Sequence, residues 1–397
     1  MIRKLKNLAH LALAIFANVI NGFPANKITV IGVTGTDGKT TTTSIISHIL
    51  NQAGHKAAMI TTVGAYINGQ MNSMGFHVTT PSAFALQKFL KDAVQAKHGY
   101  AVIETSSHGI DQNRIWGIPY KVAAITNITH EHLDYHKTFE AYVQTKFKFL
   151  KSAKTAVINL DDLVIEKYSN TLNNKVLTYS KSKDTDLNLS NYPFESNLFG
   201  SFNQSNILAA IGVCKELGLS DDQIRAGLKT FKAPLGRQDI VWDKDFKVMV
   251  DFAHTPNSLE NILHEAKATQ PKRLIHLFGA PGRRDQAKRP LMGATSSKYA
   301  DVIIIAPDDP RDENISDVNN SIKQGIDSKF KLNENLFVFE DRLKAIEFAL
   351  SQALPGDFVL LTGKGHESTL ALANQELPWN EREIVLQILN KKKDPKV

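Results

Sequence analysis

Cysteine is almost absent from this 397-residue sequence, and its scarcity excludes two kinds of covalent or metal staple. Cys214 is the only cysteine, so the chain can form neither an intramolecular disulfide nor a cysteine-rich zinc site. A chain of this length needs neither, because it can bury a large apolar core. Scarce cysteine also agrees with a reducing compartment, and we therefore expect a cytoplasmic protein.

Low-complexity segments, internal repeats and apolar runs of transmembrane length are also missing. Hydrophobic residues make up 42% of the chain and charged residues 22%, which is typical of a globular enzyme and excludes a collagen-like or wholly disordered chain. Lysine and arginine outnumber aspartate and glutamate by 47 to 40, a balance that permits phosphorylated ligands, nucleic acid or an anionic membrane. The charges are dispersed except for the short run Lys391–Lys393, which we interpret as a solvated terminus, so no nucleic-acid partner is predicted.

The N-terminus is basic and then apolar. Three basic residues between positions 3 and 6 precede an apolar run from Leu8 to Ile20. Crossing a bilayer takes about 20 apolar residues, so this run falls short. No convincing signal-peptide cleavage site follows it. We expect residues 5–20 to form a helix that packs on the first domain, with contact to a membrane surface as the alternative.

Short β-branched runs alternate with helical patterns along the rest of the chain. The first run, KITVIG at residues 27–32, leads into a glycine-rich turn and a helix over about 41–53. Such alternation predicts an α/β fold with mostly parallel sheets. Further strands are expected at residues 100–104, 122–126, 156–160, 247–251, 273–279, 301–306, 336–339 and 357–362.

The segment Pro234-Leu235-Gly236 separates two sets of strands and is the expected hinge. We therefore expect an N-terminal helix within residues 1–27, a first domain over 28–235 and a second over 236–397.

Residues 30–43 read VIGVTGTDGKTTTT, a strand that runs into a glycine-rich turn and then a helix. The glycines let backbone N–H groups face phosphate oxygens, and the helix N-terminus adds partial positive charge. Lys39 can reach the terminal phosphates, and the Thr40 hydroxyl can bind Mg²⁺. Val33 stands where the general P-loop pattern has glycine, but the shorter pattern G-T-x-G-K-T fits throughout. The segment predicts an ATP-binding loop composed of Gly35, Thr36, Asp37, Gly38, Lys39, Thr40 and Thr41.

Two polar segments follow strand ends beyond this loop. Glu104 ends the strand expected at 100–104, on the edge where open α/β sheets bind ligands, and its carboxylate can hold Mg²⁺. The second polar segment, residues 125–136, contains three histidines, which by themselves would suggest a zinc site. The nearby phosphate loop and Glu104 instead favour Mg²⁺ or Mn²⁺. Lys146, on the helix that follows, has the sequence context of a surface lysine. The second segment, ITNITHEHLDYH, supplies the side chains of His130, His132, Asp134 and His136.

With these motifs the sequence resembles the Mur ligases, the ATP-dependent amide-forming enzymes of peptidoglycan synthesis. GTDGKTTT resembles their phosphate loop, and ETSSHGIDQNR and TNITHEHLDYH resemble the segments that follow it. The resemblance runs from about Ile28 to the end, and it implies a central P-loop domain followed by a Rossmann-like α/β domain that binds an amino acid. Later motifs resemble the branch that adds the third residue of the stem peptide: GRQDIV at 236–241, VDFAHTPNSLE at 250–260, RRDQAKRPLMG at 283–293, DDPR at 308–311 and GKGHE at 363–367.

The resemblance implies a catalytic centre with two metal ions. Thr40, Glu104 and His132 match the residues that hold two Mg²⁺ ions in the family, and Lys39 matches the phosphate-loop lysine. A lysine fourteen positions after that histidine is carbamylated in the family and helps to bind the second ion, and Lys146 matches it. The nucleotide contacts implied outside the loop are Asn206, Arg237, Asp251 and His254.

The resemblance also implies two substrate sites. An arginine at the end of the DDPR motif can grip the distal carboxylate of meso-diaminopimelate, which lysine lacks, so Arg311 favours diaminopimelate. Asp309 departs from the family's usual asparagine and adds a negative charge beside that pocket. Contacts to the acceptor, a muramyl dipeptide, match Thr79, Thr80, Ser106, Gln112 and Arg114. The amino-acid pocket matches Arg284, Asp308, Arg311, Gly363 and Glu367.

The reaction implied is the ATP-dependent joining of a diamino acid to the D-Glu carboxylate of the acceptor through an acyl phosphate. Closure about the hinge near Arg237 would exclude water from that intermediate. Full family members carry an N-terminal domain that binds the UDP end of the acceptor, whereas about 27 residues precede the first expected strand here. Recognition of UDP by that route is therefore not expected, and we expect a monomer that acts on small molecules.

Two other functions compete with this one. A ligase on the same two-domain core, similar to folylpolyglutamate synthase or lipid II isoglutaminyl synthase, would also lack the UDP-binding domain. The latter usually carries a four-cysteine zinc insertion that one cysteine excludes, and the DDPR and GKGHE segments are unlike the folate enzyme. A non-catalytic nucleotide-binding scaffold is the other alternative, and the complete set of Lys39, Glu104 and Lys146 argues against it.

Overall fold

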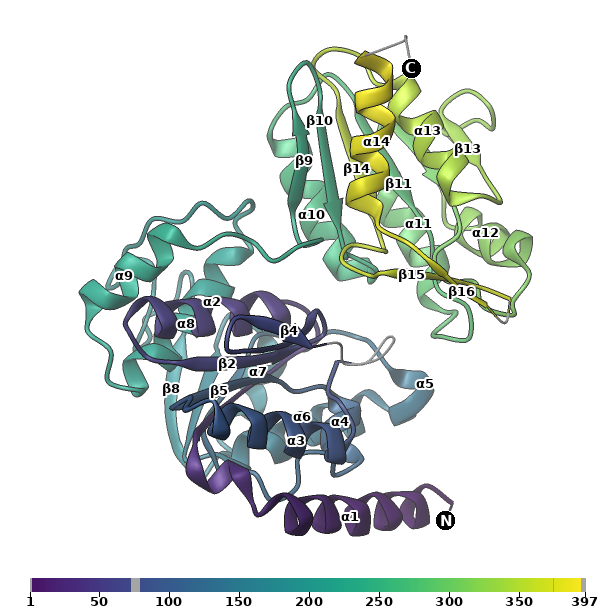
Figure 1. The fold of residues 1–397 in the computed structure, drawn as a ribbon. Helices are drawn as coiled ribbons and strands as arrows, with labels where there is room; N and C mark the ends of the chain where they lie inside the picture. Colours follow the sequence, from purple (N-terminus) through teal and green to yellow (C-terminus); the bar gives the residue numbers. More distant parts are fainter. Residues whose placement is uncertain (1, 73–78, 374, 394–397) are drawn as a thin grey trace. The chain divides into compact units, whose positions relative to one another are not determined.

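The computed structural model describes residues 2–72, 79–373 and 375–393, and the chain divides into two compact units. Unit 1 spans Met1–Lys232 and unit 2 spans Ala233–Val397. Each unit carries helices on a mostly parallel sheet (Figure 1). The predicted α/β fold class is therefore confirmed.

Unit 1 is built on an eight-stranded sheet in the order β4-β3-β2-β5-β1-β6-β7-β8. β1 (Thr29–Thr34) lies between β5 (Tyr100–Glu104) and β6 (Tyr120–Ile125) and pairs in parallel with both. The carboxyl ends of these strands therefore meet at one edge, where open α/β sheets bind their ligands. The other strands are β2 (Ala57–Thr61), β3 (Gly64–Ile67), β4 (Gln70–Asn72), β7 (Thr155–Asn159) and β8 (Lys175–Tyr179).

Apolar side chains cover both faces of this sheet. On β1, Val30 joins one apolar cluster while Ile31 and Val33 join another, because successive side chains of a strand point to opposite faces. α2 (Lys39–Gln52) packs with α8 (Asn203–Glu216) and α9 (Asp221–Thr230) over the second cluster. The remaining helices of unit 1 after α1 are η1 (Pro24–Lys27), α3 (Ala83–Gln95), α4 (Ser107–Asp111), α5 (Leu133–His136), α6 (Phe139–Ser152) and α7 (Leu163–Ser169).

α1 (Ile2–Asn21) confirms the helix that we predicted over residues 5–20, and it packs against α3. Ala14 and Ala17 are fully buried in that contact, and the Asn18 side chain donates a 2.9 Å hydrogen bond to the carbonyl of Trp116. Within the described parts of the chain, no helix is both long and apolar enough to cross a membrane.

Unit 2 holds a six-stranded sheet in the order β13-β12-β11-β14-β10-β9, in which only the edge strand β9 (Asp239–Asp243) runs antiparallel to its neighbour. The loops after β12 (Val302–Ile305) and β14 (Phe358–Thr362) leave the same edge, because both strands pair in parallel with β11 (Leu274–Phe278). The other elements are β10 (Lys247–Asp251), β13 (Leu336–Val338), β15 (Thr369–Leu372), β16 (Gln375–Pro378), α10 (Pro256–Ala268), α11 (Lys288–Tyr299), α12 (Ile315–Lys323), α13 (Arg342–Gln352) and α14 (Glu381–Lys393).

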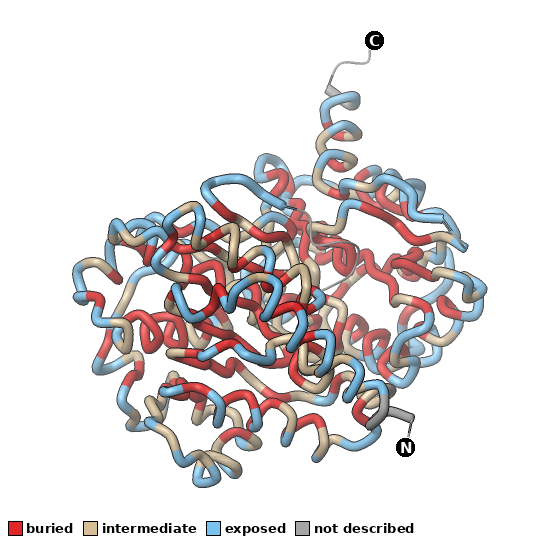
Figure 2. The backbone as a smooth tube through the Cα atoms, turned by 60° about the horizontal axis from the view of Figure 1, so that its bottom comes forward, coloured by how far each residue is buried: buried red, intermediate tan, exposed pale blue. Residues whose placement is uncertain are grey.

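The predicted buried strands all occur, with ends displaced by one or two residues, whereas the exposed strands were not predicted. β4 and β16 are exposed along their whole length, so they lack the apolar runs by which we recognised the other strands. In Figure 2 the buried residues gather in the interior, and the exposed residues lie mainly along the outer turns.

Candidate active site

The phosphate loop connects β1 to α2 and lies directly against α8. Gly38 has a φ of +80°, and a Cβ added there would lie 2.2 Å from Oδ1 of Asn206, so glycine is required both by the backbone and by the close approach of α8. The Thr42 hydroxyl donates to the same Oδ1 at 3.5 Å. Asn206, which we predicted as a nucleotide contact, therefore lies beside the loop, although 168 residues separate it from Gly38.

The residues after β6 hold the loop from its other side. The backbone N–H of Asp37 donates to Asn127 Oδ1 at 2.9 Å, and the Thr126 hydroxyl donates to the carbonyl of Asp37 at 2.6 Å. The Lys39 ammonium donates to the carbonyl of Thr36 at 2.7 Å. Sequence reasoning did not select Thr126 and Asn127, although both follow the strand that neighbours the loop.

Glu104 and Thr40 are brought together as their motifs predict. The Thr40 hydroxyl donates to Glu104 Oε2 at 2.9 Å, and the backbone N–H of Thr62 donates to the same oxygen at 2.9 Å. Both Thr40 and Glu104 are buried, at 3% and 2% exposure. A carboxylate and a hydroxyl at a phosphate loop are hard oxygen ligands, so this pair fits Mg²⁺.

Lys146 is not the surface residue that its helix position alone suggests. Its side chain is 1% exposed, its ammonium donates to the carbonyl of Gly35 at 2.7 Å, and it lies 4.5 Å from the centre of the Tyr142 ring. Burial lowers the pKa of Lys146 well below its ordinary value, and the nearby charge of Lys39 lowers the pKa further. The lowered pKa favours the neutral, nucleophilic form of this amine over its ammonium form.

His132 lies in an aromatic cluster at the start of α5, in the left-handed conformation with φ +57°. Its ring lies 4.7 Å from that of His108 and 6.3 Å from that of Tyr142. The Tyr142 hydroxyl shares a 3.0 Å hydrogen bond with the Thr36 hydroxyl, so this cluster adjoins the phosphate loop. His136 joins the cluster through ring contacts with His108 and Tyr142, His130 stacks on Phe139, and the Asp134 side chain lies outside the described atoms.

The five residues predicted to contact the acceptor form one hydrogen-bonded network. The Thr80 hydroxyl donates to the Glu104 carbonyl at 3.1 Å and accepts from the Ser106 backbone N–H at 2.8 Å. Arg114 donates to the Thr80 carbonyl at 2.7 Å and, through Nε and Nη2, to Gln112 Oε1 at 2.9 and 2.6 Å. The Thr62 hydroxyl donates to the Thr79 hydroxyl at 3.2 Å, and the Thr62 backbone N–H binds Glu104, so Thr79 belongs to the same network.

In unit 2, two of the predicted nucleotide residues, Arg237 and His254, contact Phe252. The Arg237 guanidinium lies 4.3 Å from the ring centre, and His254 Nδ1 bonds the Phe252 carbonyl at 2.9 Å. Asp251 accepts from the backbone N–H groups of Gln238 and Ala253, both at 2.7 Å. The segment after the hinge is thereby fixed to the end of β10.

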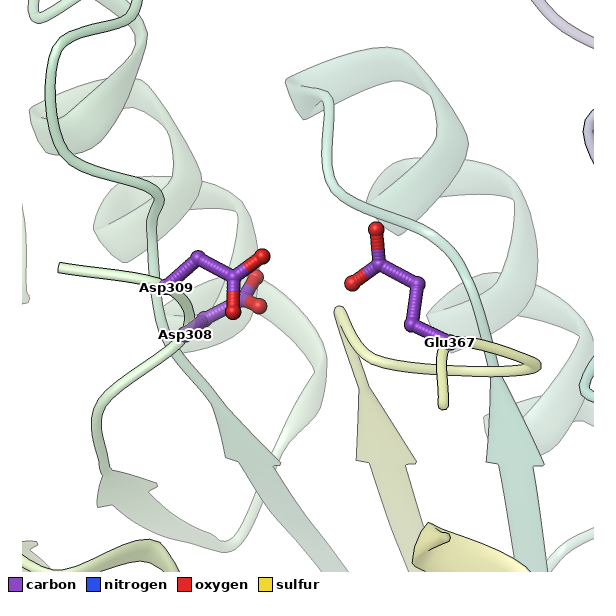
Figure 3. Close-up of side chains that lie close together, drawn as sticks. All are labelled: Asp308, Asp309 and Glu367. Carbon is purple, nitrogen blue, oxygen red and sulfur yellow. The ribbon is translucent and has the colours of Figure 1, made fainter. Parts of the chain in front are cut away.

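The predicted amino-acid pocket is centred on three carboxylates. Asp308 and Asp309 come from the loop after β12, Glu367 comes from the loop after β14, and the three lie within 4.8 Å of one another (Figure 3). Lys364, which the sequence analysis did not select, is fully buried among them and donates to Asp309 at 2.7 Å and to Glu367 at 2.6 Å. Burial raises the pKa of Asp308 to about 7, and the neighbouring carboxylates also raise it.

The other predicted pocket residues lie on the same loops. Gly363 has a φ of +108°, and a Cβ there would lie 2.5 Å from Asp308 Oδ2. The Arg311 backbone N–H donates to the Ala371 carbonyl at 3.1 Å, and Arg284 is exposed on the loop after β11.

Arg342 is a further residue that the motifs did not indicate. It is 1% exposed, forms a two-point ion pair with Glu381 at 2.6 and 2.9 Å, and donates to the carbonyls of Pro307 and Thr362. It therefore connects the residues that precede Asp308 and Gly363. No nearby motif marks it, because its partners come from three separate segments.

Family models match both units. Residues 33–214 match the Mur ligase middle domain, and residues 236–365 match the Mur ligase glutamate ligase domain.

The chain belongs to the Mur ligase family.

Its curated relatives in this family include UDP-N-acetylmuramoyl-L-alanyl-D-glutamate--2,6-diaminopimelate ligases. The enzyme of Clostridium botulinum is 36% identical over 95% of this chain and 81% of its own length. The enzyme of Aquifex aeolicus is also 36% identical, over 95% of this chain and 81% of its own length. A solved structure of a ligase of this name is 30% identical, with a TM-score of 0.60 over 92% of this chain and 79% of its own. The Mycobacterium tuberculosis folylpolyglutamate synthase, solved with ADP and AMPPCP, shares the fold at 16% identity, with a TM-score of 0.69 over 90% and 96%.

As a Mur ligase, the protein is an ATP-dependent carbon–nitrogen ligase that acts on small-molecule substrates, so the predicted enzyme class is confirmed. The folate-enzyme alternative shares the fold alone.

Proposed function

We propose that this Mur ligase joins meso-diaminopimelate to the D-Glu carboxylate of a muramyl dipeptide in peptidoglycan precursor synthesis. The observation that carries the proposal is the unbroken set of hydrogen bonds from Thr40 through Glu104 to Thr80, Ser106 and Arg114. These bonds join the end of the phosphate loop to the polar side chains that match the acceptor contacts of the family. The relatives that carry this activity in their names are similar over nearly the whole chain.

In the proposed reaction, an acceptor carboxylate oxygen attacks the γ-phosphorus of ATP and ADP leaves. The amino-acid ammonium then loses a proton, the free amine attacks the acyl carbon, and inorganic phosphate leaves as the C–O bond to it breaks. A second proton leaves the nitrogen as the amide forms. Lys39 stabilises charge on the transferred phosphoryl group, and the loop N–H groups hold the remaining phosphates. Gly35, Thr36, Asp37, Gly38 and Thr41 complete this loop.

Two Mg²⁺ ions would neutralise phosphate charge in this reaction. We assign Thr40, Glu104, His132 and Lys146 as their protein ligands, on the support of the buried Thr40–Glu104 oxygen pair and of the position of Lys146 beside Gly35. A neutral buried amine reacts with carbon dioxide to form a carbamate, and the resulting anion would supply the oxygen ligand that an ammonium cannot.

Residues of unit 2 are proposed to bind the nucleotide and the amino acid. Arg237, Asp251 and His254 would contact the nucleotide, with Phe252 as the apolar surface to which they are fixed. Residues 236–397 would bind the amino acid through Arg284, Asp308, Arg311, Gly363 and Glu367, and residues 28–235 would bind ATP and the acceptor.

A panel of amino acids crossed with acceptors tests this function by release of inorganic phosphate. The acceptors are UDP-linked and UDP-free muramyl-L-Ala-D-Glu, with a folate as a further arm. We expect phosphate release with diaminopimelate on a muramyl dipeptide and little with lysine. Phosphate release only with glutamate on the folate, or in no combination, would overturn the proposal.

We further propose that the protein is a cytoplasmic monomer that makes peripheral contact with anionic membranes through α1. Two asparagines of α1 face the rest of unit 1: Asn7 donates to Asp111 at 3.0 Å, and Asn18 donates to the carbonyl of Trp116 at 2.9 Å. The opposite face is apolar, with Leu8, Phe16 and Val19 each more than half exposed. The exposed apolar side chains of α1 are Leu8, Leu13, Ile15, Phe16, Val19 and Ile20.

Charge supports a membrane as the occupant of this face. The first acidic residue in the sequence is Asp37, and Lys6 is exposed at the basic end of the helix. An apolar face beside basic residues matches the interface of an anionic bilayer.

Vesicle sedimentation tests the contact. We expect binding to phosphatidylglycerol vesicles, weaker binding to phosphatidylcholine vesicles, and a loss of about tenfold in Phe16→Ser/Val19→Ser. Leu163→Ser, which changes a residue that is 75% exposed on α7, is the matched control. Absence of vesicle binding would refute the membrane contact. A dimer in light scattering that the double variant dissociates would instead assign the apolar face to another copy of the chain.

A further inference from the structure

Asp309 lies in the loop after β12, and one oxygen of its side chain accepts two hydrogen bonds. Its Oδ1 accepts from the Lys364 ammonium at 2.7 Å and from the Ala371 backbone N–H at 2.9 Å. Asp309 is 3% exposed and Lys364 is fully buried. A buried carboxylate with these two donors is compensated within the protein and does not need a substrate cation.

Lys364 retains its charge in this environment. Burial by itself would lower the pKa of Lys364, but the charges of Glu367, Asp308 and Asp309 outweigh it and raise the pKa above its ordinary value. The ammonium therefore remains a cation at neutral pH. It also binds Glu367 at 2.6 Å, so a single buried charge fixes carboxylates from both pocket loops.

The Asp309 side chain and the Arg311 backbone bind the same residue of β15. Asp309 Oδ1 accepts from the N–H of Ala371, and the Arg311 N–H donates to the carbonyl of Ala371 at 3.1 Å. Asp309 and Arg311 both have positive φ values, +47° and +57°, which non-glycine residues adopt only when their surroundings impose them. The two bonds to Ala371 restrain this turn together with a 2.9 Å hydrogen bond from the Gly282 N–H to the Asp309 carbonyl.

We propose that Lys364 and Asp309 are positioning residues that set amino-acid specificity: Lys364 neutralises Asp309, and Asp309 fixes the turn that carries Arg311. This inference rests on the proposed function, because it concerns which amino acid the same pocket accepts. Asp309 would then leave the selection of a distal carboxylate to Arg311, and it would not attract the distal ammonium of lysine.

The charge pairing predicts an unusual order of effects among variants. Asp309→Asn keeps an acceptor for Ala371 but weakens the bond to Lys364, so kcat/KM for diaminopimelate should fall several-fold, and much less than in Lys364→Met. Lys364→Met leaves Asp309 charged and uncompensated, and kcat/KM for diaminopimelate should fall roughly 100-fold, mostly through a higher KM. Lys364→Met/Asp309→Asn should recover about tenfold of that loss, because the uncompensated charge is gone.

The experiment measures phosphate release with diaminopimelate and with lysine for wild type and these three variants. Lys323→Met, at an exposed lysine of α12, is the matched control, and each variant is checked by thermal unfolding. We expect the ratio of kcat/KM for diaminopimelate to that for lysine to fall in Lys364→Met and to recover in the double variant.

Two results would overturn the inference while leaving the ligase function intact. One is a double variant no more active than Lys364→Met, and the other is a wild type that prefers lysine and loses lysine activity in Asp309→Asn. A wild type that uses no amino acid at all would instead refute the proposed function, so the two failures are distinguishable.

Discussion

The Thr40 hydroxyl donates a 2.9 Å hydrogen bond to the Glu104 carboxylate, so the first turn of α2 is tied to the end of β5. The two residues are separated by 64 positions, and the parallel pairing of β1 with β5 brings them together. This contact joins the phosphate loop to the side chains that we assign to the acceptor.

Loss of the loop lysine or of Glu104 should abolish catalysis without unfolding the protein. We expect Lys39→Ala and Glu104→Gln each to lower kcat by at least about 1000-fold, because both act on phosphoryl charge in the transition state. ADP formation at saturating substrates measures this effect. Lys56→Ala, at an exposed lysine of unit 1, should match wild type, and comparable turnover in Lys39→Ala would contradict the assignment.

The proposed carbamylation of Lys146 can be tested by carbon-13 NMR. With ¹³C-labelled bicarbonate, we expect a carbamate carbon signal in wild type at neutral pH that is missing in Lys146→Met, since the low pKa keeps the amine reactive. Lys146→Met fills the same apolar surroundings, so its unfolding temperature should stay near that of wild type. Full activity of this variant, unaffected by bicarbonate, would exclude the carbamate.

The Arg342–Glu381 pair should be essential for the stability of unit 2. Arg342→Met leaves a buried carboxylate uncompensated, at a cost of about 3–5 kcal/mol in the free energy of unfolding. Arg342→Met/Glu381→Leu should recover part of that loss in urea denaturation. The double variant should still show a raised KM for the amino acid, because Arg342 also bonds the carbonyls that precede Asp308 and Gly363.

His276 should make stability depend on pH. Burial lowers the pKa of His276 to about 3, with the charge of Arg342 as a further cause, from an ordinary 6.5. Between about pH 6.5 and pH 3 the unfolded chain binds a proton at His276 that the folded chain does not bind. The free energy of unfolding therefore falls as pH decreases through this range, by a few kcal/mol in total. His276→Gln should flatten this slope in urea denaturation.

Asp308 should make the free energy of unfolding depend on pH in the opposite direction to His276, so its contribution has to be removed in a control variant. Its raised pKa of about 7 means that the folded chain holds a proton which the unfolded chain has lost, so stability falls as pH rises from about 4 to 7. Measuring the pH dependence of the free energy of unfolding for His276→Gln in an Asp308→Asn background separates the contribution of the histidine from that of the aspartate. An unchanged slope after His276→Gln would show that the histidine is not the source.

The buried strands and the local motifs were predictable because their signals lie within a few neighbouring residues. Apolar β-branched runs marked the strands of both sheets, and GTDGKTTT marked the phosphate loop. The exposed strands β4 and β16 were missed because they carry no apolar run, and the short strands β2, β3 and β15 were missed although they are mostly buried.

By itself, the sequence determined the chemistry: a lysine, a threonine and a glutamate at a strand–loop–helix unit and at the end of a neighbouring strand. Only the tertiary structure decided that Lys146 is buried and that Lys364 neutralises Asp309. The reason is physical. A motif states which groups are present, whereas burial and charge pairing depend on segments far apart in the chain that meet at the edge of a parallel sheet.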